Sequence, residues 1–159
     1  MSDDFLREIR KDSTNIGFDA IEKKLKTKYI HDGNSAMFLE GRRGLRIIVD
    51  HGIAKEWSEI NCKTEIKIFE KCGMKVIDHI IAEKVYSYLV QPEEKFYKEL
   101  EKIPDSKWSG MTSVTKTISQ DILGQIEKTA SSIGFTLEEI LQLMAENAYI
   151  AELRSKKNL

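Results

Sequence analysis

The feature that most constrains this chain is an ordered series of turn and helix signals within Val114–Met144. β-branched residues lead into Ser119, a residue type that caps the N-termini of helices. An apolar stripe at helical spacing follows and ends at Gly134, where a left-handed residue commonly terminates a helix. Thr136 and Glu139 then have the spacing of a capping box. The pattern predicts a short strand followed by two helices joined by a tight turn.

This order of elements resembles the ribbon-helix-helix family of DNA-binding proteins, which includes antitoxins and other regulators. The resemblance covers residues 112–150 only, and the N-terminal part matches no pattern that we recognise. The matching positions are Ile118, Ile122, Leu123, Ile126, Ala130, Gly134, Thr136, Glu139, Ile140 and Leu141. The resemblance implies a homodimer, because a unit of about 40 residues cannot bury enough apolar area alone. Paired strands of two copies would enter the major groove as a ribbon.

The resemblance also implies which residues contact DNA. Hydroxyl groups on alternate strand residues can bond base edges, and free N–H groups at the start of the second helix can hold a phosphate. The candidates are Ser113, Thr115, Lys116, Thr117, Phe135 and Thr136. Among them Lys116 falls on the other face of the strand, beside Val114 and Ile118. The net charge of the whole chain is −1, so any affinity for DNA must come from a local surface.

Turn-forming residues between Pro104 and Gly110 predict a domain boundary. We therefore expect an α+β protein of two parts. Residues 1–108 would form a mixed domain with a small antiparallel sheet and helices. Residues 109–159 would form the helical, ribbon-helix-helix-like unit.

Within the first part, hydrophobic periodicity predicts individual elements. Helices are expected over residues 18–30 and 92–103, and strands over 35–40 and 44–50, joined by the turn "GRRG". Strict alternation predicts a further strand over residues 63–70. Apolar spacing favours a helix at Val76, Ile77, Ile80 and Ile81, and leaves the continuation to residue 90 open between helix and strand.

Three charged residues suggest a nuclease as an alternative. Asp50 ends one predicted strand, and Glu65 and Lys67 share a face of another. This arrangement resembles the PD-(D/E)xK nucleases, in which two carboxylates hold Mg²⁺ and the lysine assists the attacking water. A solvated strand face with cross-strand charge pairs explains the same residues. Mg²⁺ enters only in this alternative, and we predict no other cofactor or metal site.

Three arginines, Arg42, Arg43 and Arg46, gather at the predicted hairpin turn. Guanidinium groups bind phosphates and carboxylates through paired hydrogen bonds, so this turn is a candidate contact for an anion or an acidic partner. A charged hairpin tip with no ligand is the competing interpretation.

The composition sets the remaining limits. With 41% hydrophobic and 32% charged residues, the chain can bury a core. No stretch approaches the roughly 18 apolar residues of a membrane span, and no signal segment starts the chain, so we expect a cytoplasmic protein without a membrane partner.

Three hypotheses about function remain. The first is a dimeric DNA-binding transcriptional regulator or antitoxin-like protein. The second is a non-catalytic module that binds or inhibits another protein, and the third is the nuclease. No nucleophile motif and no phosphate-binding glycine loop marks the chain as an enzyme.

Overall fold

The computed structural model describes residues 18–108 and 119–156. The elements in these ranges are α2 (Phe18–Asp32), β1 (Ser35–Gly41), β2 (Gly44–Asp50), α3 (Lys55–Lys71), β3 (Lys75–Ile81), β4 (Val85–Gln91), α4 (Glu94–Leu100), α5 (Asp105–Trp108), α6 (Gln120–Ser132) and α7 (Leu137–Lys156). Helices surround a four-stranded antiparallel sheet, which confirms the predicted α+β class. No helix in the described ranges combines the length and the apolar character that crossing a bilayer requires.

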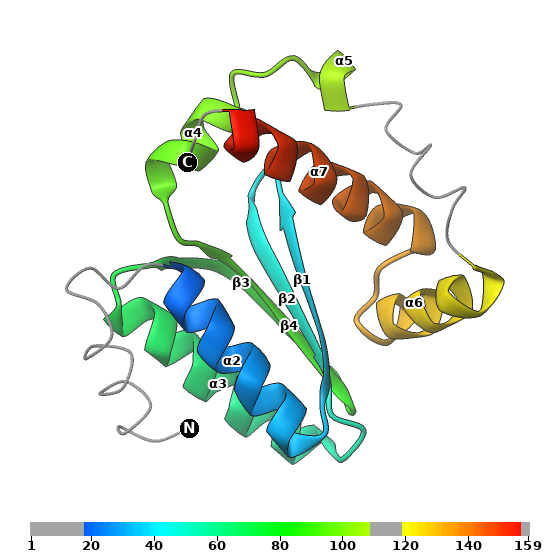
Figure 1. The fold of residues 1–159 in the computed structure, drawn as a ribbon. Coiled ribbons are helices and arrows are strands. Elements are labelled where there is room, and N and C mark those ends of the chain that lie inside the picture. The colour runs from blue at the N-terminus through cyan, green and yellow to red at the C-terminus, as the bar shows by residue number, and fades with distance from the viewer. Residues whose placement is uncertain (1–17, 109–118, 157–159) are drawn as a thin grey trace.

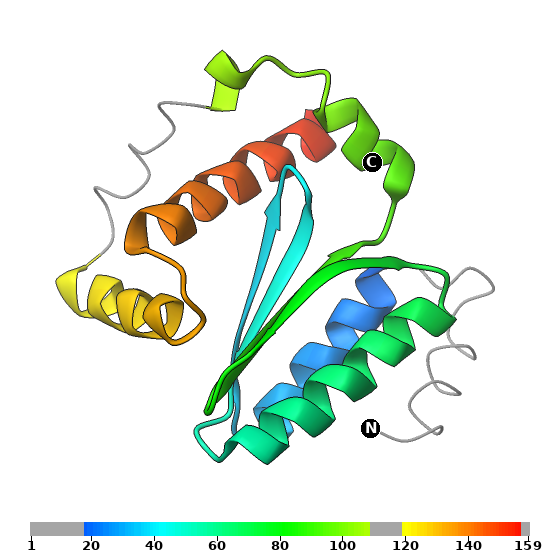
Figure 2. The same cartoon turned by 180° about the vertical axis from the view of Figure 1, so that it is seen from behind.

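The sheet forms the middle of three layers (Figures 1 and 2). Its strand order is β1-β2-β4-β3, so two hairpins join through β2 and β4. Helices α2 and α3 cover one face, around a cluster that includes Leu25, Ile47, Phe69 and Tyr88. Helices α6 and α7 cover the other face, where Ile48 belongs to a second cluster. Because both faces are covered, the central strands are buried along almost their whole length.

The first hairpin confirms the prediction made from the "GRRG" turn. Gly41 pairs with Gly44 at the end of the β1–β2 ladder. A Cβ atom on Gly41 would lie 2.7 Å from Cδ2 of Leu143, so a larger residue here would displace that side chain of α7. Glycine at this position therefore lets α7 pack closely on the turn.

The strand predicted over residues 63–70 is wrong, because these residues belong to helix α3. Charged and apolar residues do alternate in this window, but the window covers only part of the 17-residue helix. Over the whole helix the buried positions are Ser58, Cys62, Glu65, Ile68 and Phe69, which have helical spacing. Two of them, Ser58 and Glu65, are polar, so a pattern based on hydrophobicity alone does not detect the buried face.

The helical spacing that favoured a helix at residues 75–81 was also misleading, because β3 occupies this range and β4 follows it. The sheet has apolar partners on both faces. Val76 and Ile81 pack on the α2–α3 side, and Ile80 packs on the α6–α7 side. An irregularity in register between Val76 and Asp78 shifts the alternation further. Apolar residues on both faces of a strand reproduce helical spacing by chance.

The signals at the ends of the C-terminal helices are confirmed. The Oγ of Ser119 accepts a hydrogen bond from the N–H of Ile122 at 3.4 Å, as expected for an N-cap. Gly134 has φ +81° and ends the first helix in the left-handed region. Thr136 and Glu139 exchange two hydrogen bonds of 3.1 Å and form the capping box. The preceding strand, with the candidates Ser113, Thr115, Lys116 and Thr117, lies outside the described residues.

Helix α7 packs on the sheet of its own chain. The side-chain oxygen Oδ1 of Asn147 accepts a hydrogen bond from the N–H of Glu40 in β1 at 2.9 Å. The guanidinium of Arg154 donates to both carboxylate oxygens of Glu40. Trp108 and Ile150 share a third buried cluster with residues of α4. The boundary predicted after residue 108 therefore separates two segments that share hydrophobic clusters.

Candidate functional site

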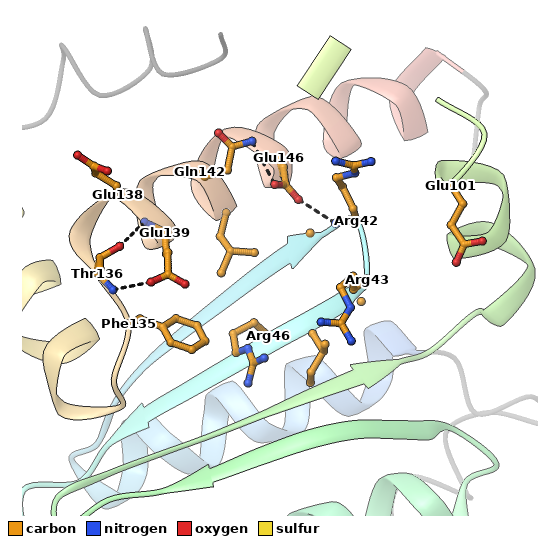
Figure 3. Close-up of a pocket in the computed structure, with 14 residues that line it drawn as sticks. Arg42, Arg43, Arg46, Glu101, Phe135, Thr136, Glu138, Glu139, Gln142 and Glu146 are labelled. Atoms are coloured by element: carbon orange, nitrogen blue, oxygen red, sulfur yellow. Dashed lines mark hydrogen bonds between the residues drawn. The ribbon is translucent and has the colours of Figure 1, made fainter. Parts of the chain in front are cut away.

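A cavity of about 670 Å³ lies between the β1–β2 turn, β2 and the first half of α7 (Figure 3). This volume is in the range of small-molecule sites. The cavity brings together the arginines of the predicted anion contact and two of the residues implied as DNA contacts. Its lining includes Gly41, Arg42, Arg43, Gly44, Arg46, Leu89, Glu101, Phe135, Thr136, Glu138, Glu139, Gln142, Leu143 and Glu146.

Arg46 is buried and held rigidly in the wall of this cavity. Its guanidinium makes two hydrogen bonds to the carboxylate of Asp78 in β3, at 2.7 and 2.9 Å. A third bond, of 3.2 Å, reaches the hydroxyl of Ser87 in β4. The ring of Phe135 lies 5.2 Å from the guanidinium carbon. Arg46 therefore has its charge matched inside the protein and supplies a fixed surface against which a ligand can pack.

Arg42 is also engaged. Its guanidinium pairs with the carboxylate of Asp105 at 2.6 Å and lies 5.1 Å from the centre of the Trp108 ring. Its backbone N–H donates to the carboxylate of Glu146 at 3.0 Å. These contacts connect the turn to α5 and α7.

Arg43 differs from both neighbours. Its backbone oxygen accepts a hydrogen bond from the side-chain amide of Gln91 at 2.7 Å, which anchors the main chain. Within residues 18–108 and 119–156, its guanidinium has no hydrogen-bond or ion-pair partner. The side chain is exposed and borders the cavity. Of the three arginines, Arg43 is the one whose hydrogen-bond donors remain available to a ligand.

Four glutamates also border the cavity, and two of them are occupied. Glu139 closes the capping box, and Glu146 accepts bonds from Arg42 and Gln142. Glu101 and Glu138 are exposed at the rim. The cavity therefore has mixed charge rather than a uniformly positive field.

The other face of the sheet holds a buried carboxylate, that of Glu65. The side chain is 0% exposed and accepts hydrogen bonds from the hydroxyls of Tyr29, Tyr86 and Tyr88, the last at 2.8 Å. Burial raises the pKa of Glu65, and the three tyrosine hydrogen bonds oppose that shift. Burial and the nearby Glu65 raise the pKa of Cys62 to about 12, so this thiol is unreactive. This cluster joins α2, α3 and β4.

The three residues of the nuclease alternative do not come together. Asp50 lines a second cavity, of about 440 Å³, on the α6 side of the sheet. Glu65 faces the tyrosines on the opposite side, and Lys67 is exposed on α3. Asp50 and Glu65 therefore do not form the pair of neighbouring carboxylates that this chemistry needs to hold Mg²⁺. In the described ranges no three His, Cys, Asp or Glu side chains gather as a metal site.

His51 and Ser58 lie 2.5 Å apart through Nε2 and Oγ, a contact that suggests an activated serine. However, Nδ1 of His51 accepts a hydrogen bond from the N–H of Ile53. The proton of the neutral ring is therefore on Nε2, which donates to Ser58, and the hydroxyl of Ser58 donates to the backbone oxygen of Glu83. Desolvation lowers the pKa of His51, which maintains this neutral form. The pair fixes the turn before α3 and does not activate a nucleophile.

Helix α6 covers the sheet with only part of its apolar stripe. Ile126, Ala130 and Ile133 are buried against the sheet. Ile122, one turn nearer the N-terminus, is 51% exposed, and Leu123 is half-buried. The start of α6 thus presents apolar surface that the described part of the chain does not cover.

No protein-family model matches this chain, and neither the curated proteins nor the solved structures contain a significant match.

Sequence reasoning identified the arginines and the helix caps but missed two arrangements. The first is the tyrosine cluster around Glu65, for which the alternating Tyr86 and Tyr88 were an available signal. The second is the approach of Phe135 to Arg46. These residues are far apart in the sequence, and no local pattern connects them.

Proposed function

We propose that this protein is a dimeric DNA-binding regulator in which residues 112–150 of two copies form a ribbon-helix-helix unit. The observation that carries the proposal is the uncovered start of α6. Its apolar stripe continues to Ile122, which is 51% exposed, beyond the part buried on the chain's own sheet. In a dimer that pairs the segments before α6, the second copy would cover this surface. The matching positions Ile126, Ala130 and Ile140 pack on the chain's own sheet, so the contact between copies would be confined to the start of α6 and the segment before it.

The local geometry of the α6–α7 hairpin supports the same proposal. The Ser119 cap, the left-handed Gly134 and the capping box at Thr136 have the positions that the resemblance requires. Of the N–H groups expected to hold a phosphate, that of Phe135 donates to the backbone oxygen of Ala130 and that of Thr136 donates to the carboxylate of Glu139. The N–H groups of Leu137 and Glu138 have no acceptor in the described part of the chain and would have to bind a DNA phosphate instead. Thr115 and Thr117 would then face the base edges.

The dimer is the first test. Light scattering at micromolar concentration is expected to give the mass of two chains. Ile122→Asp places a charge in the proposed contact and is expected to give a monomer. Ile60→Asp is the matched control, because Ile60 is 64% exposed on α3 and lies outside the contact. A wild-type protein that is monomeric, or equal behaviour of the two variants, contradicts the proposal.

DNA binding is the second test. Retention of random-sequence duplex DNA in a mobility-shift assay at low ionic strength is expected for the wild type, since phosphate contacts dominate non-specific binding. The double variant Thr115→Ala, Thr117→Ala removes the proposed base contacts, so it is expected to keep this non-specific retention and the midpoint of unfolding. It should lose the preference for duplexes that the wild type selects from a random library. A dimer that retains no DNA would disprove the DNA-binding part alone.

A specific surface favours the second candidate, a non-catalytic interaction module. Ile53, Trp57 and Ile60 are all exposed. Trp57 and Ile60 are three residues apart in α3 and share one side of it, and Ile53 lies in the turn just before the helix. Contiguous exposed apolar residues often mark a protein interface. A monomer that retains no DNA, and whose stable complex with a protein partner is lost in Trp57→Ser, would favour this candidate.

A further inference from the structure

We propose that the cavity between the β1–β2 turn and α7 binds a small organic carboxylate with an apolar or aromatic body, and that Arg43 holds its carboxylate group. Binding at this site does not require the dimer or DNA, so it can be present or absent independently of the regulator proposal. The proposed ligand site is the cavity whose lining residues Figure 3 draws as sticks.

Arg43 is chosen because the other two arginines at the cavity already pair with carboxylates. Arg46 is matched by Asp78, and Arg42 is matched by Asp105. The guanidinium of Arg43 borders the same cavity and has no partner in the described ranges. A guanidinium is well suited to a carboxylate, because its parallel N–H groups match the two oxygens.

The other residues that line the cavity indicate that the ligand has an apolar part. The ring of Phe135 lies against the guanidinium of Arg46, which its bonds to Asp78 and Ser87 hold in place. Leu89 and Leu143 add aliphatic surface to the lining. A rigid apolar wall next to one free cation is the arrangement expected for an amphipathic ligand.

The rim determines the charge of the ligand. Exposed Glu101 and Glu138 border the cavity and have no cation to neutralise them in the ion pairs of the described residues. They lower the affinity for any anion, and most strongly for one that carries several negative charges, such as inorganic phosphate. A single carboxylate matches the single available arginine, so we infer a monoanion.

Isothermal titration with three probes tests this site on the full chain. Phenylacetate carries both the carboxylate and the ring, phenylacetamide keeps the ring without the charge, and inorganic phosphate carries charge without an apolar body. We expect saturable binding of phenylacetate, and binding of the other two weaker by about tenfold or more, the value of one charge-assisted hydrogen bond.

Arg43→Gln is the decisive variant, and Lys67→Gln is its matched control. Both remove one positive charge from an exposed side chain, but Lys67 lies on α3, on the opposite face of the sheet. We expect Arg43→Gln to weaken phenylacetate binding by about tenfold and Lys67→Gln to leave it unchanged. Equal effects of the two variants, phosphate binding as tight as that of phenylacetate, or no saturable binding by the wild type would each overturn the proposal.

Discussion

Ionisable side chains on the two faces of the sheet differ in burial and in hydrogen-bond partners. On the α2–α3 face, the carboxylate of Glu65 is completely enclosed and accepts hydrogen bonds from three tyrosines. On the α6–α7 face, three arginines border an open cavity, and one of them, Arg43, has no partner in the described residues. A satisfied, enclosed group holds elements together, whereas an open group with free donors is available to a ligand. Substitutions on the two faces should therefore affect different properties.

The largest expected effect is that of Glu65→Ala on stability. The change leaves three buried tyrosine hydroxyls without their acceptor and creates a cavity, so we expect a loss of about 3–5 kcal/mol in the free energy of unfolding. Urea unfolding followed by circular dichroism measures it. Lys67→Ala, an exposed position on the same helix, is the control. A loss under about 1 kcal/mol in Glu65→Ala would show that this face is not held by the cluster.

A smaller effect is expected from pH. The folded-state pKa of Glu65 is raised, so the unfolded chain ionises this carboxyl first. Its contribution to stability is fully present below about pH 4.5 and is lost as the pH rises through the folded pKa. As the pH rises through this range, the free energy of unfolding of the wild type should therefore decrease more than that of Glu65→Gln, whose side chain cannot ionise. Parallel curves for the two proteins would contradict the raised pKa.

His51 gives the opposite trend and serves as an internal comparison. Its folded pKa is lowered, so its contribution is present above about pH 6.5 and is lost as the pH falls toward the folded pKa. His51→Gln should flatten the loss of stability that accompanies falling pH and leave the Glu65-dependent loss with rising pH intact.

On the open face, Thr136→Ala should cost about 1 kcal/mol of unfolding free energy, since it removes the N-cap of α7. Thr27→Ala is the control, because the hydroxyl of Thr27 bonds the backbone oxygen of Lys23 inside α2 and caps nothing. Thermal unfolding of both variants makes the comparison. Equal losses would show that the capping box adds nothing specific.

The smallest expected effect on stability is that of Arg43→Gln. Its guanidinium has no partner in the described residues, so the midpoint of urea unfolding should stay within error of the wild type. This result would separate the ligand-binding role of Arg43 from a structural role. A loss of unfolding free energy as large as that of Thr136→Ala would show that Arg43 has a structural role, against the proposed difference between the two faces.

Several elements were predictable because their signals are local. The Gly41–Gly44 turn, the Ser119 cap and the capping box at Thr136 each involve residues within four positions of one another. Backbone sterics and neighbouring hydrogen bonds determine such features wherever the segment lies. The helix of residues 63–70 was not predictable in this way, because its buried face contains Ser58 and Glu65, which are polar.

The candidate sites show the same division. The sequence placed Arg42, Arg43 and Arg46 at one turn, and nothing in it showed that α7 would close a cavity over them. The partners that separate the three arginines, Asp105 for Arg42 and Asp78 for Arg46, lie 63 and 32 residues away along the chain. Which arginine stays available is therefore decided by distant carboxylates.

By itself, the sequence determined the start and end of α6, the start of α7, the first hairpin, the α+β class and the arginine-rich turn. The helix ends and the turn depend on short-range sterics and hydrogen bonding. The tertiary structure decided that Glu65 is enclosed by tyrosines and that Arg43 borders a cavity without a partner in the described residues. Burial and long-range pairing set those two outcomes, and both depend on how separate elements pack rather than on any local pattern.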